Sequence, residues 1–404
     1  MTDPEAAVLL DLTRLVSRMG QGPHTGIDRV EYAYLQQLVA QDAPVFALVR
    51  TGFGYVLLDR AGMAGLAARI AGGVPLGRAG LLGRLAHAKR PLRARAEADV
   101  RRLAVARAAG PWLTRMLRRH LPQGGRYFNT GHANLSDAVM RAVRRAGLRI
   151  AVLVHDTIPL DFPAYCRPDT IDGFREKMRV VARQADLVIH TSRDARRRTE
   201  AQFAALGRVP PGVVANLGVP VPVPVPVSGP DGSMVGDAPY FVALGTIEPR
   251  KNHALLLDIW EEMGAAAPML YILGARGWSN TAVFARLDAL GPGARVREVP
   301  GLGDGAVAAL LAGARALLFP SHAEGFGLPA LEAAGLGTAV ISADLPVIRE
   351  LLGDNAVYLD VTDSYSWIET ILRLSGASEP PSRQNRRFEP PGWPEHFKIV
   401  LNVT

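Results

Sequence analysis

The segment PSHAEGFGLPALEAAGLG, residues 320–337, follows the apolar run 316–319 and decides how the second half of this chain folds. The apolar run has the length and composition of a buried strand. Gly325 and Gly327 allow a tight turn with close backbone approach, and Pro329 suits the start of a helix. The segment therefore predicts a strand, a glycine turn and a helix that begins at the end of the strand.

Two glutamates flank this turn. Glu324 precedes it, and Glu332 follows in what we expect to be the first helical turn, where side chains lean back toward the N-terminus. The unpaired amides at a helix start attract phosphate or sugar oxygens. We therefore predict that both carboxylates face one ligand pocket.

Strand-like apolar runs alternate with helical patterns along most of the 404 residues, which is typical of α/β proteins with parallel sheets. The predicted strands are 8–12, 45–49, 127–129, 150–155, 187–191, 213–216, 240–244, 269–273, 296–299, 316–319, 339–342 and 356–359. Repeated Val-Pro and then glycine at 218–238 interrupt the alternation and predict a stiff linker. We expect doubly wound domains at 1–217 and 239–375, a ligand cleft between them, and a C-terminal arm on the surface at 376–404.

Composition narrows the classes of protein. With 48% hydrophobic and 21% charged residues and no long apolar run, the chain has the composition of a soluble globular protein. Its acidic start lacks the features of a secretory leader, so we expect a cytoplasmic protein. The single cysteine, Cys166, excludes an internal disulfide and a cysteine-rich zinc site and fits a reducing compartment.

The net charge of +8 is concentrated in residues 75–126, which hold thirteen basic and two acidic side chains. Apolar residues among these charges indicate basic helices with apolar faces. Such helices fit either an anionic membrane surface, as a peripheral contact on the inner face of the cytoplasmic membrane, or an ordinary protein surface. Because no nucleic-acid-binding motif accompanies the charge, we expect no nucleic acid partner.

The spacing of Glu324 and Glu332 within EGFGLPALEA resembles the E-x7-E signature of retaining glycosyltransferases of the family 4 type. GTIEPRKN at 245–252, GARGW at 274–278 and the turn at 301–304 extend the resemblance through most of the second half. The resemblance implies a GT-B fold, in which two Rossmann-like domains with parallel sheets face each other across a cleft. It also implies that the second domain binds a nucleotide diphosphate sugar.

The resemblance assigns roles in the donor site. Arg250 and Lys251, close to Gly245, would bind the diphosphate and stabilise the departing nucleotide, whose negative charge develops during the reaction. Glu332 would accept hydrogen bonds from the ribose, and Glu324 from a hydroxyl of the donor sugar. The turn residues expected to contact the donor are Gly325, Phe326, Gly327 and Leu328.

In the first half, the family places a histidine beside the transferred sugar, and His155 at the end of a predicted strand matches it. Thr25 and Gly26 resemble the glycine loop that approaches the phosphates and the acceptor, with Thr-Gly where Gly-Gly is commoner. The surrounding loop resembles bacterial mannosyltransferases of surface polysaccharide assembly. We therefore expect transfer of a hexose or deoxyhexose, mannose or rhamnose favoured, to a glycan or lipid-linked acceptor.

Other functions use similar residues. A glycosidase needs two acids on either side of one bond, whereas Glu324 and Glu332 are predicted on one side of a ligand. No Asp-x-Asp element occurs, so we expect neither a metal nor another cofactor, and activity in excess chelator. Two alternatives stay open: a nucleotide-sugar epimerase-like enzyme of similar two-domain fold, and a catalytically silent sugar-binding scaffold.

Overall fold

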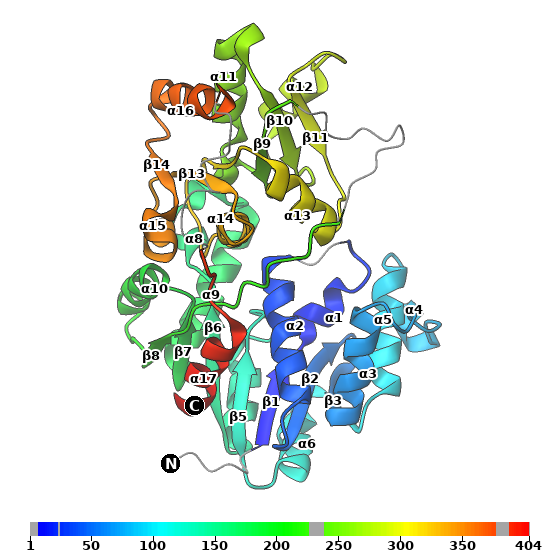
Figure 1. The fold of residues 1–404 in the computed structure, drawn as a ribbon. Coiled ribbons are helices and arrows are strands. Elements are labelled where there is room, and N and C mark those ends of the chain that lie inside the picture. The colour runs from blue at the N-terminus through cyan, green and yellow to red at the C-terminus, as the bar shows by residue number, and fades with distance from the viewer. Residues whose placement is uncertain (1–6, 23–24, 226–237, 377–387, 404) are drawn as a thin grey trace.

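In the computed structural model, which describes residues 7–22, 25–225, 238–376 and 388–403, the chain forms two α/β domains, each built on its own sheet (Figure 1). The first sheet has eight strands in the order β4-β3-β2-β1-β5-β6-β7-β8. These strands are β1 (Ala7–Asp11), β2 (Val45–Thr51), β3 (Gly54–Leu58), β4 (Ala106–Ala108), β5 (Gly125–Asn129), β6 (Leu148–Val154), β7 (Leu187–His190) and β8 (Gly212–Val214).

Parallel pairing runs from β2 through β1 and β5 to β8, as the sequence predicted. The other edge differs, because β3 and β4 pair antiparallel and neither was predicted. β4 has only three residues and no buried side chain, so it lacks the apolar run that marks the other strands.

Helices cover both faces of the first sheet, because successive residues of each strand point to opposite faces. On β1, Leu10 joins a core with α2, α3, α5 and the C-terminal α17, whereas Leu9 joins a core with α6, α7, α9 and α10. The helices of this domain are α1 (Thr13–Arg18), α2 (Gly26–Val39), α3 (Arg60–Ile70), α4 (Leu81–Ala86), α5 (Pro91–Arg102), α6 (Leu113–His120), α7 (Asp137–Arg145), α8 (Ile158–Asp161), α9 (Pro168–Gln184), α10 (Arg193–Ala205) and α17 (Trp393–Val403).

The C-terminal segment corrects one expectation. Instead of lying as an arm on the surface, α17 packs into the first domain, and its Phe397 and Val400 are buried there (Figure 1). Its His396 lies 2.8 Å from the hydroxyl of Tyr34 in α2. The prolines before Trp393 end any longer helix, but the eleven residues after them form an amphipathic helix with its own apolar face. Residues 377–387 lie outside the described residues.

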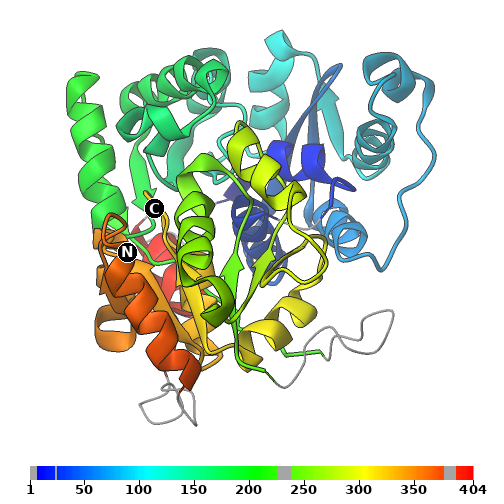
Figure 2. The same cartoon turned by 90° about the horizontal axis from the view of Figure 1, so that it is seen from above.

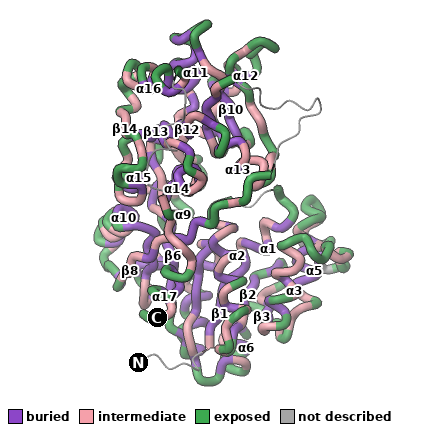
Figure 3. Tube along the Cα trace, in the orientation of Figure 1, coloured by how far each residue is buried: buried purple, intermediate pink, exposed green. Residues whose placement is uncertain are grey.

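The second domain has a six-stranded parallel sheet in the order β11-β10-β9-β12-β13-β14, and all six strands were predicted. Its strands are β9 (Tyr240–Leu244), β10 (Met269–Leu273), β11 (Val296–Val299), β12 (Ala316–Phe319), β13 (Ala339–Ala343) and β14 (Val357–Leu359). Its helices are α11 (His253–Met263), α12 (Thr281–Asp288), α13 (Asp304–Gly313), α14 (Leu328–Gly335), α15 (Pro346–Leu352) and α16 (Ser364–Gly376). One face of the sheet packs on α11, α12 and α16, and the other on α13, α14 and α15 (Figure 3).

The chain crosses between the domains as an extended segment over residues 217–225. Val219 N donates to Pro391 O at 2.9 Å, and Val225 N donates to Gly305 O at 2.9 Å, so this segment touches the C-terminal return at one end and α13 at the other. Residues 226–237, the rest of the predicted linker, lie outside the described residues. Seen from above, the blue helices of residues 60–102 project beyond the second domain (Figure 2).

Candidate functional site

The glycine turn after β12 contacts the first domain. Gly327 has φ 84°, a left-handed conformation that glycine adopts without steric cost, and α14 begins directly after it. A Cβ atom on Gly325 would lie 2.7 Å from Asp156 Oδ2 and 3.0 Å from His155 O, so only a glycine fits against the end of β6 here. The turn therefore brings the start of α14 to the first domain.

Arg250 and Lys251 meet Glu324 at adjacent strand ends, because β9 and β12 are neighbours in the sheet. Lys251 Nζ lies 2.6 Å from Glu324 Oε1, and Arg250 Nη1 lies 3.0 Å from Glu324 Oε2. Arg250 Nη2 also pairs with Glu248 Oε1 at 2.8 Å and Nη1 donates to Ala323 O at 2.7 Å. The predicted diphosphate-binding cations and the predicted sugar-binding acid are thus gathered in one ionic cluster beside Gly245, whose Cβ would lie 3.3 Å from Lys251 Cε.

Electrostatics keep this cluster charged although it is buried. Burial raises the pKa of Glu324, but Arg250 and Lys251 outweigh burial and lower that pKa to about 2. Burial lowers the pKa of Lys251, and Glu324 partly offsets this. Glu324 is therefore an anion at neutral pH, held between two cations.

Glu332 lies elsewhere in the site than predicted. It is the fifth residue of α14, one position beyond the first turn, and it forms a hydrogen-bonded ion pair with Arg29 of α2. It lines a cavity of about 690 Å³ together with Gly26, Arg29, Asp304 and Leu328, and Glu324 is not among the lining residues. The two acids therefore do not face one pocket: Glu324 turns to the cations at the end of β9, while Glu332 points across to the first domain.

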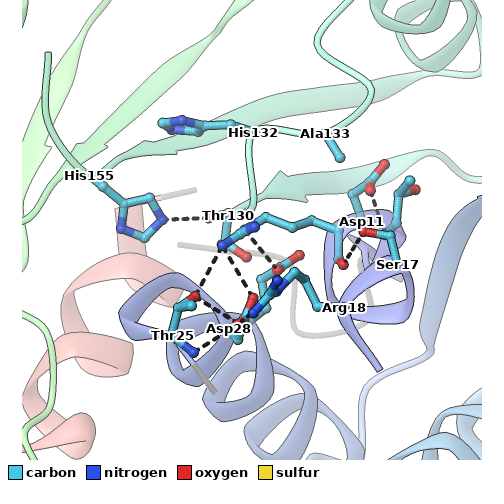
Figure 4. Close-up of polar contacts among 12 residues, drawn as sticks. Asp11, Ser17, Arg18, Thr25, Asp28, Thr130, His132, Ala133 and His155 are labelled. Carbon is cyan, nitrogen blue, oxygen red and sulfur yellow. Dashed lines mark hydrogen bonds and ion pairs between the residues drawn. The ribbon is translucent and has the colours of Figure 1, made fainter. Parts of the chain in front are cut away.

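In the first domain, Thr25 is the N-cap residue of α2, and its side chain is hydrogen-bonded to Asp28. Its Oγ1 donates to Asp28 Oδ2 at 2.7 Å, and its N donates to the same oxygen at 2.9 Å (Figure 4). Arg14 Nη2 donates to Thr25 Oγ1 at 3.1 Å and pairs with Asp28 Oδ1 at 3.3 Å. Gly26 faces the other domain, since a Cβ there would lie 3.1 Å from Leu328 Cδ1. Residues 23 and 24 of this loop lie outside the described residues.

His155 is buried and neutral. Burial lowers its pKa to about 4, and its Nε2 lies 2.7 Å from Thr130 O (Figure 4). Because a carbonyl oxygen accepts hydrogen bonds only, Nε2 carries the proton and Nδ1 is left as an acceptor. His155 can thus accept a hydroxyl hydrogen but supplies no positive charge.

The loop after β5 holds Thr130 O in place. His132 and Asn134 in this loop adopt φ values of 56° and 55°, which non-glycine residues adopt at an energetic cost. Asn134 Nδ2 donates to Asp11 Oδ2 at 2.7 Å, which stabilises the loop against the end of β1. These strained residues position the carbonyl that orients His155.

Sequence reasoning assigned no role to Arg29 in the early loop and placed Asp156 only at the end of a predicted strand. Arg29 lies three residues after Gly26, so it shares a face of α2 with a predicted site residue, and that spacing could have found it. Asp156 directly follows His155, and it is close enough to Arg250 for the arginine to lower its pKa, although burial raises it overall.

The described ranges hold neither a cluster of metal-binding side chains nor a membrane-spanning helix. No group of three or more histidine, cysteine, aspartate or glutamate side chains in these ranges could hold a metal ion. None of the helices in the same ranges is long and apolar enough to cross a membrane.

Two facing α/β domains whose strand-end loops meet across a gap define the class of GT-B folds, and solved structures support this assignment. HepE of Anabaena, crystallised in complex with UDP-glucose, superposes with a TM-score of 0.63 at 14% identity, over 98% of this chain and 99% of that one. The lipopolysaccharide outer core galactosyltransferase WaaB gives 0.56 at 15% identity, over 98% and 99%.

Residues 231–387 match the family described as Glycosyl transferases group 1. The serotype-specific mannosyltransferase WbdA of Escherichia coli is 32% identical over 281 residues, which cover 64% of this chain and 34% of WbdA. O-antigen chain mannosyltransferase B of Escherichia coli is 32% identical over 127 residues, 31% of this chain and 33% of that protein. The chain thus matches about a third of the length of these curated relatives.

Proposed function

We propose that this chain is a retaining, metal-independent glycosyltransferase that moves a hexose or deoxyhexose from a nucleotide diphosphate sugar to a glycan or lipid-linked acceptor in cell-surface polysaccharide synthesis. The observation that carries the proposal is the buried cluster of Arg250, Lys251 and Glu324 at the strand ends that face the first domain. Two cations beside a helix start suit a diphosphate, and a carboxylate held ionised between them suits sugar hydroxyls.

The names of similar proteins support the substrate class. WbdA and O-antigen mannosyltransferase B are named for mannosyl transfer, which favours mannose, and HepE was crystallised with UDP-glucose, which supports a nucleotide-sugar donor. Rhamnose stays the second sugar that we propose to test.

Glu332 and Glu324 would have different roles in donor binding. Glu332, on the cavity wall, would accept hydrogen bonds from the ribose hydroxyls, while the diphosphate replaces Glu324 as a partner of Arg250 and Lys251. Charged hydrogen bonds contribute about 1.5 to 3 kcal/mol each, so Glu332→Ala should raise the KM for donor about 10 to 100-fold.

Released from its cations in this way, Glu324 would accept a hydrogen bond from a hydroxyl of the donor sugar. On the opposite side, Nδ1 of neutral His155 would accept a hydrogen bond from another sugar hydroxyl. The mechanism we propose is front-face displacement, in which the leaving phosphate, stabilised by Arg250 and Lys251, takes the acceptor proton. Each of these side chains binds or stabilises charge, and none forms a covalent bond to the sugar.

We further propose that the basic stretch 75–126 touches an anionic membrane surface on the cytoplasmic side. Its two acids are buried and already paired, Glu97 with Arg93 and Arg101, Asp99 with Arg69 and Arg102. Leu81 at the start of α4 is 80% exposed. Exposed cations around an exposed leucine fit lipid headgroups. The exposed cations near α4 are Arg78, Arg84, Lys89 and Arg90.

Vesicle sedimentation tests this contact. Protein should sediment with vesicles of phosphatidylglycerol and phosphatidylcholine at low salt and less so at high salt, because ions screen the attraction. Protein that stays in the supernatant at low salt contradicts the membrane contact.

The function itself is tested in two steps. Thermal unfolding with UDP, GDP, ADP and dTDP sugars identifies the donor, because a bound ligand stabilises the folded state by mass action. The donor is then incubated with and without a mannose-containing glycan acceptor. A transferase forms an extended glycan only when acceptor is present; conversion of the donor alone into an epimer would instead indicate the epimerase-like alternative, and binding without turnover a silent scaffold.

A further inference from the structure

Arg29 of the first domain binds two carboxylates of the second. It forms a hydrogen-bonded ion pair with Glu332 Oε1 of α14, and its Nη2 lies 2.9 Å from Asp304 Oδ1 at the start of α13. All three residues line the same cavity of about 690 Å³, between α2 and the loops of the second domain. One guanidinium therefore bridges the domains at the wall of this cavity.

The two oxygens of Glu332 are used unequally. Oε1 is taken by Arg29, whereas among the residues that the structure describes no hydrogen bond or ion pair occupies Oε2. The side chain of Glu332 is 7% exposed, and that of Arg29 is 30% exposed. Burial raises the pKa of Glu332, and Arg29 opposes this. A cationic partner such as Arg29 is needed because a carboxylate buried without one tends to take up a proton and lose its strength as an acceptor.

We propose that Arg29 is a positioning residue of the donor site: by binding Oε1 from the opposite domain, it fixes Glu332 as an ionised acceptor and leaves Oε2 for a ribose hydroxyl. This inference rests on the proposed function, which assigns Glu332 to the ribose. Asp304 holds the other side of the guanidinium and so sets its orientation.

The pairing of Arg29 with Glu332 links nucleotide binding to the arrangement of the two domains. Because Arg29 comes from the first domain, Glu332 is fully prepared for ribose only when the domains are together. Binding of a nucleotide by the second domain therefore favours the closed arrangement, since a ligand shifts the population toward the state that it binds more tightly.

The test compares a nucleotide that has ribose hydroxyls with one that lacks them. The probe is the nucleoside diphosphate, among UDP, GDP and ADP, that stabilises the protein most, together with its 2′,3′-dideoxy analogue. Affinities are measured by calorimetric titration for the whole chain and for Arg29→Met, Glu332→Gln and the double variant. Arg286→Met is the matched control, because Arg286 is 29% exposed and also pairs with two acids, Asp258 and Glu261, but on the outer surface of α12.

We expect Arg29→Met to weaken binding of the ribonucleotide about 10-fold, the loss of one charge-supported hydrogen bond, and to change binding of the dideoxy analogue by less than about twofold. The double variant should bind no more weakly than Glu332→Gln alone, because both substitutions remove the same interaction. Arg29→Lys, which keeps the charge, should recover part of the affinity, and Arg286→Met should bind both nucleotides normally.

Three results would overturn the inference, and they separate it from the proposed function. Equal losses for both nucleotides would mean that Arg29 acts other than through a ribose hydroxyl. Normal binding by Arg29→Met, with weak binding by Glu332→Gln, would refute the positioning role of Arg29 and leave the proposed function in place. Normal binding of both nucleotides by Glu332→Gln would remove the ribose assignment itself, and the inference with it.

Discussion

The hydroxyl of Tyr34 and Nε2 of His396 lie 2.8 Å apart, although 362 positions separate the two residues in the chain. The Nδ1 side of the same imidazole lies 3.1 Å from Asn216 O and 3.3 Å from Ala215 O. Carbonyls only accept hydrogen bonds, so Nδ1 donates to them and Nε2 accepts from Tyr34. The ring thus joins the C-terminal helix, the end of the first domain and α2, and its neutral form makes all these contacts.

This arrangement predicts a pH-dependent stability. Burial lowers the pKa of His396 to about 4, against 6.5 in the unfolded chain. Below pH 6.5 the unfolded state therefore binds more protons than the folded state, and stability falls as the pH is lowered toward 4. Between pH 7 and pH 5 this residue should cost about 2 kcal/mol, at 1.36 kcal/mol per pKa unit.

Urea unfolding of the wild-type chain and of His396→Gln at pH 7 and pH 5 measures this effect. Glutamine keeps a donor and an acceptor but does not titrate, so the stability lost between the two pH values should be about 2 kcal/mol smaller in the variant. Asp11 and Glu31, whose pKa values burial raises, act in the opposite direction in both proteins and cancel. His120→Gln at the end of α6 is the control; an identical pH dependence of wild type and His396→Gln would contradict the prediction.

Removing Arg250 should abolish most of the transfer. Arg250→Ala takes away a cation that would stabilise the leaving diphosphate, and we expect a rate at least about 100-fold lower. It also leaves Glu324 with only one of its two cations, which should lower the free energy of unfolding by about 3 kcal/mol. Rates at saturating donor and urea unfolding of the same preparation check both parts. Arg286→Ala on α12 should change neither, and a fully active Arg250→Ala would remove the cation from the proposed mechanism.

The rate of transfer should not depend on the ionisation of His155 or Glu324 near neutral pH. Glu324, with a pKa of about 2, is ionised above pH 3, and His155, with a pKa of about 4, is neutral above pH 5. The expected profile of kcat/KM is flat with respect to these two groups from pH 6 to pH 8. A rate that falls below pH 6.5 in the wild type, but not in His155→Gln, would show that the imidazole titrates in that range.

Transfer should continue in excess EDTA. In the proposed mechanism Arg250 and Lys251 neutralise the diphosphate, the task that a divalent cation performs where carboxylates bind the metal. The measurement is the initial rate with and without EDTA after dialysis against chelator. Loss of activity that Mg²⁺ or Mn²⁺ restores would show that the two cations are insufficient.

The amino-acid sequence by itself determined the strands of the parallel sheets, the turn at Gly325 and Gly327, and the place of Arg250, Lys251 and Glu324 in loops that follow strands. These features depend on local patterns: apolar runs set strands, glycine sets the turn, and loops that follow adjacent parallel strands lie side by side. The antiparallel edge of the first sheet was not predicted, because β4 is too short and too exposed to give such a pattern.

Only the tertiary structure decided which groups face each other across the domains. The residue pattern of α2 does not predict that Arg29 binds Glu332, 303 positions later in the chain. Nor does it predict that α17 packs against Tyr34. The same holds for the separation of Glu324 from Glu332, whose side chains leave one short segment in different directions. Such pairings arise when preformed elements dock, and their partners are set by packing between distant surfaces, which local periodicity does not record.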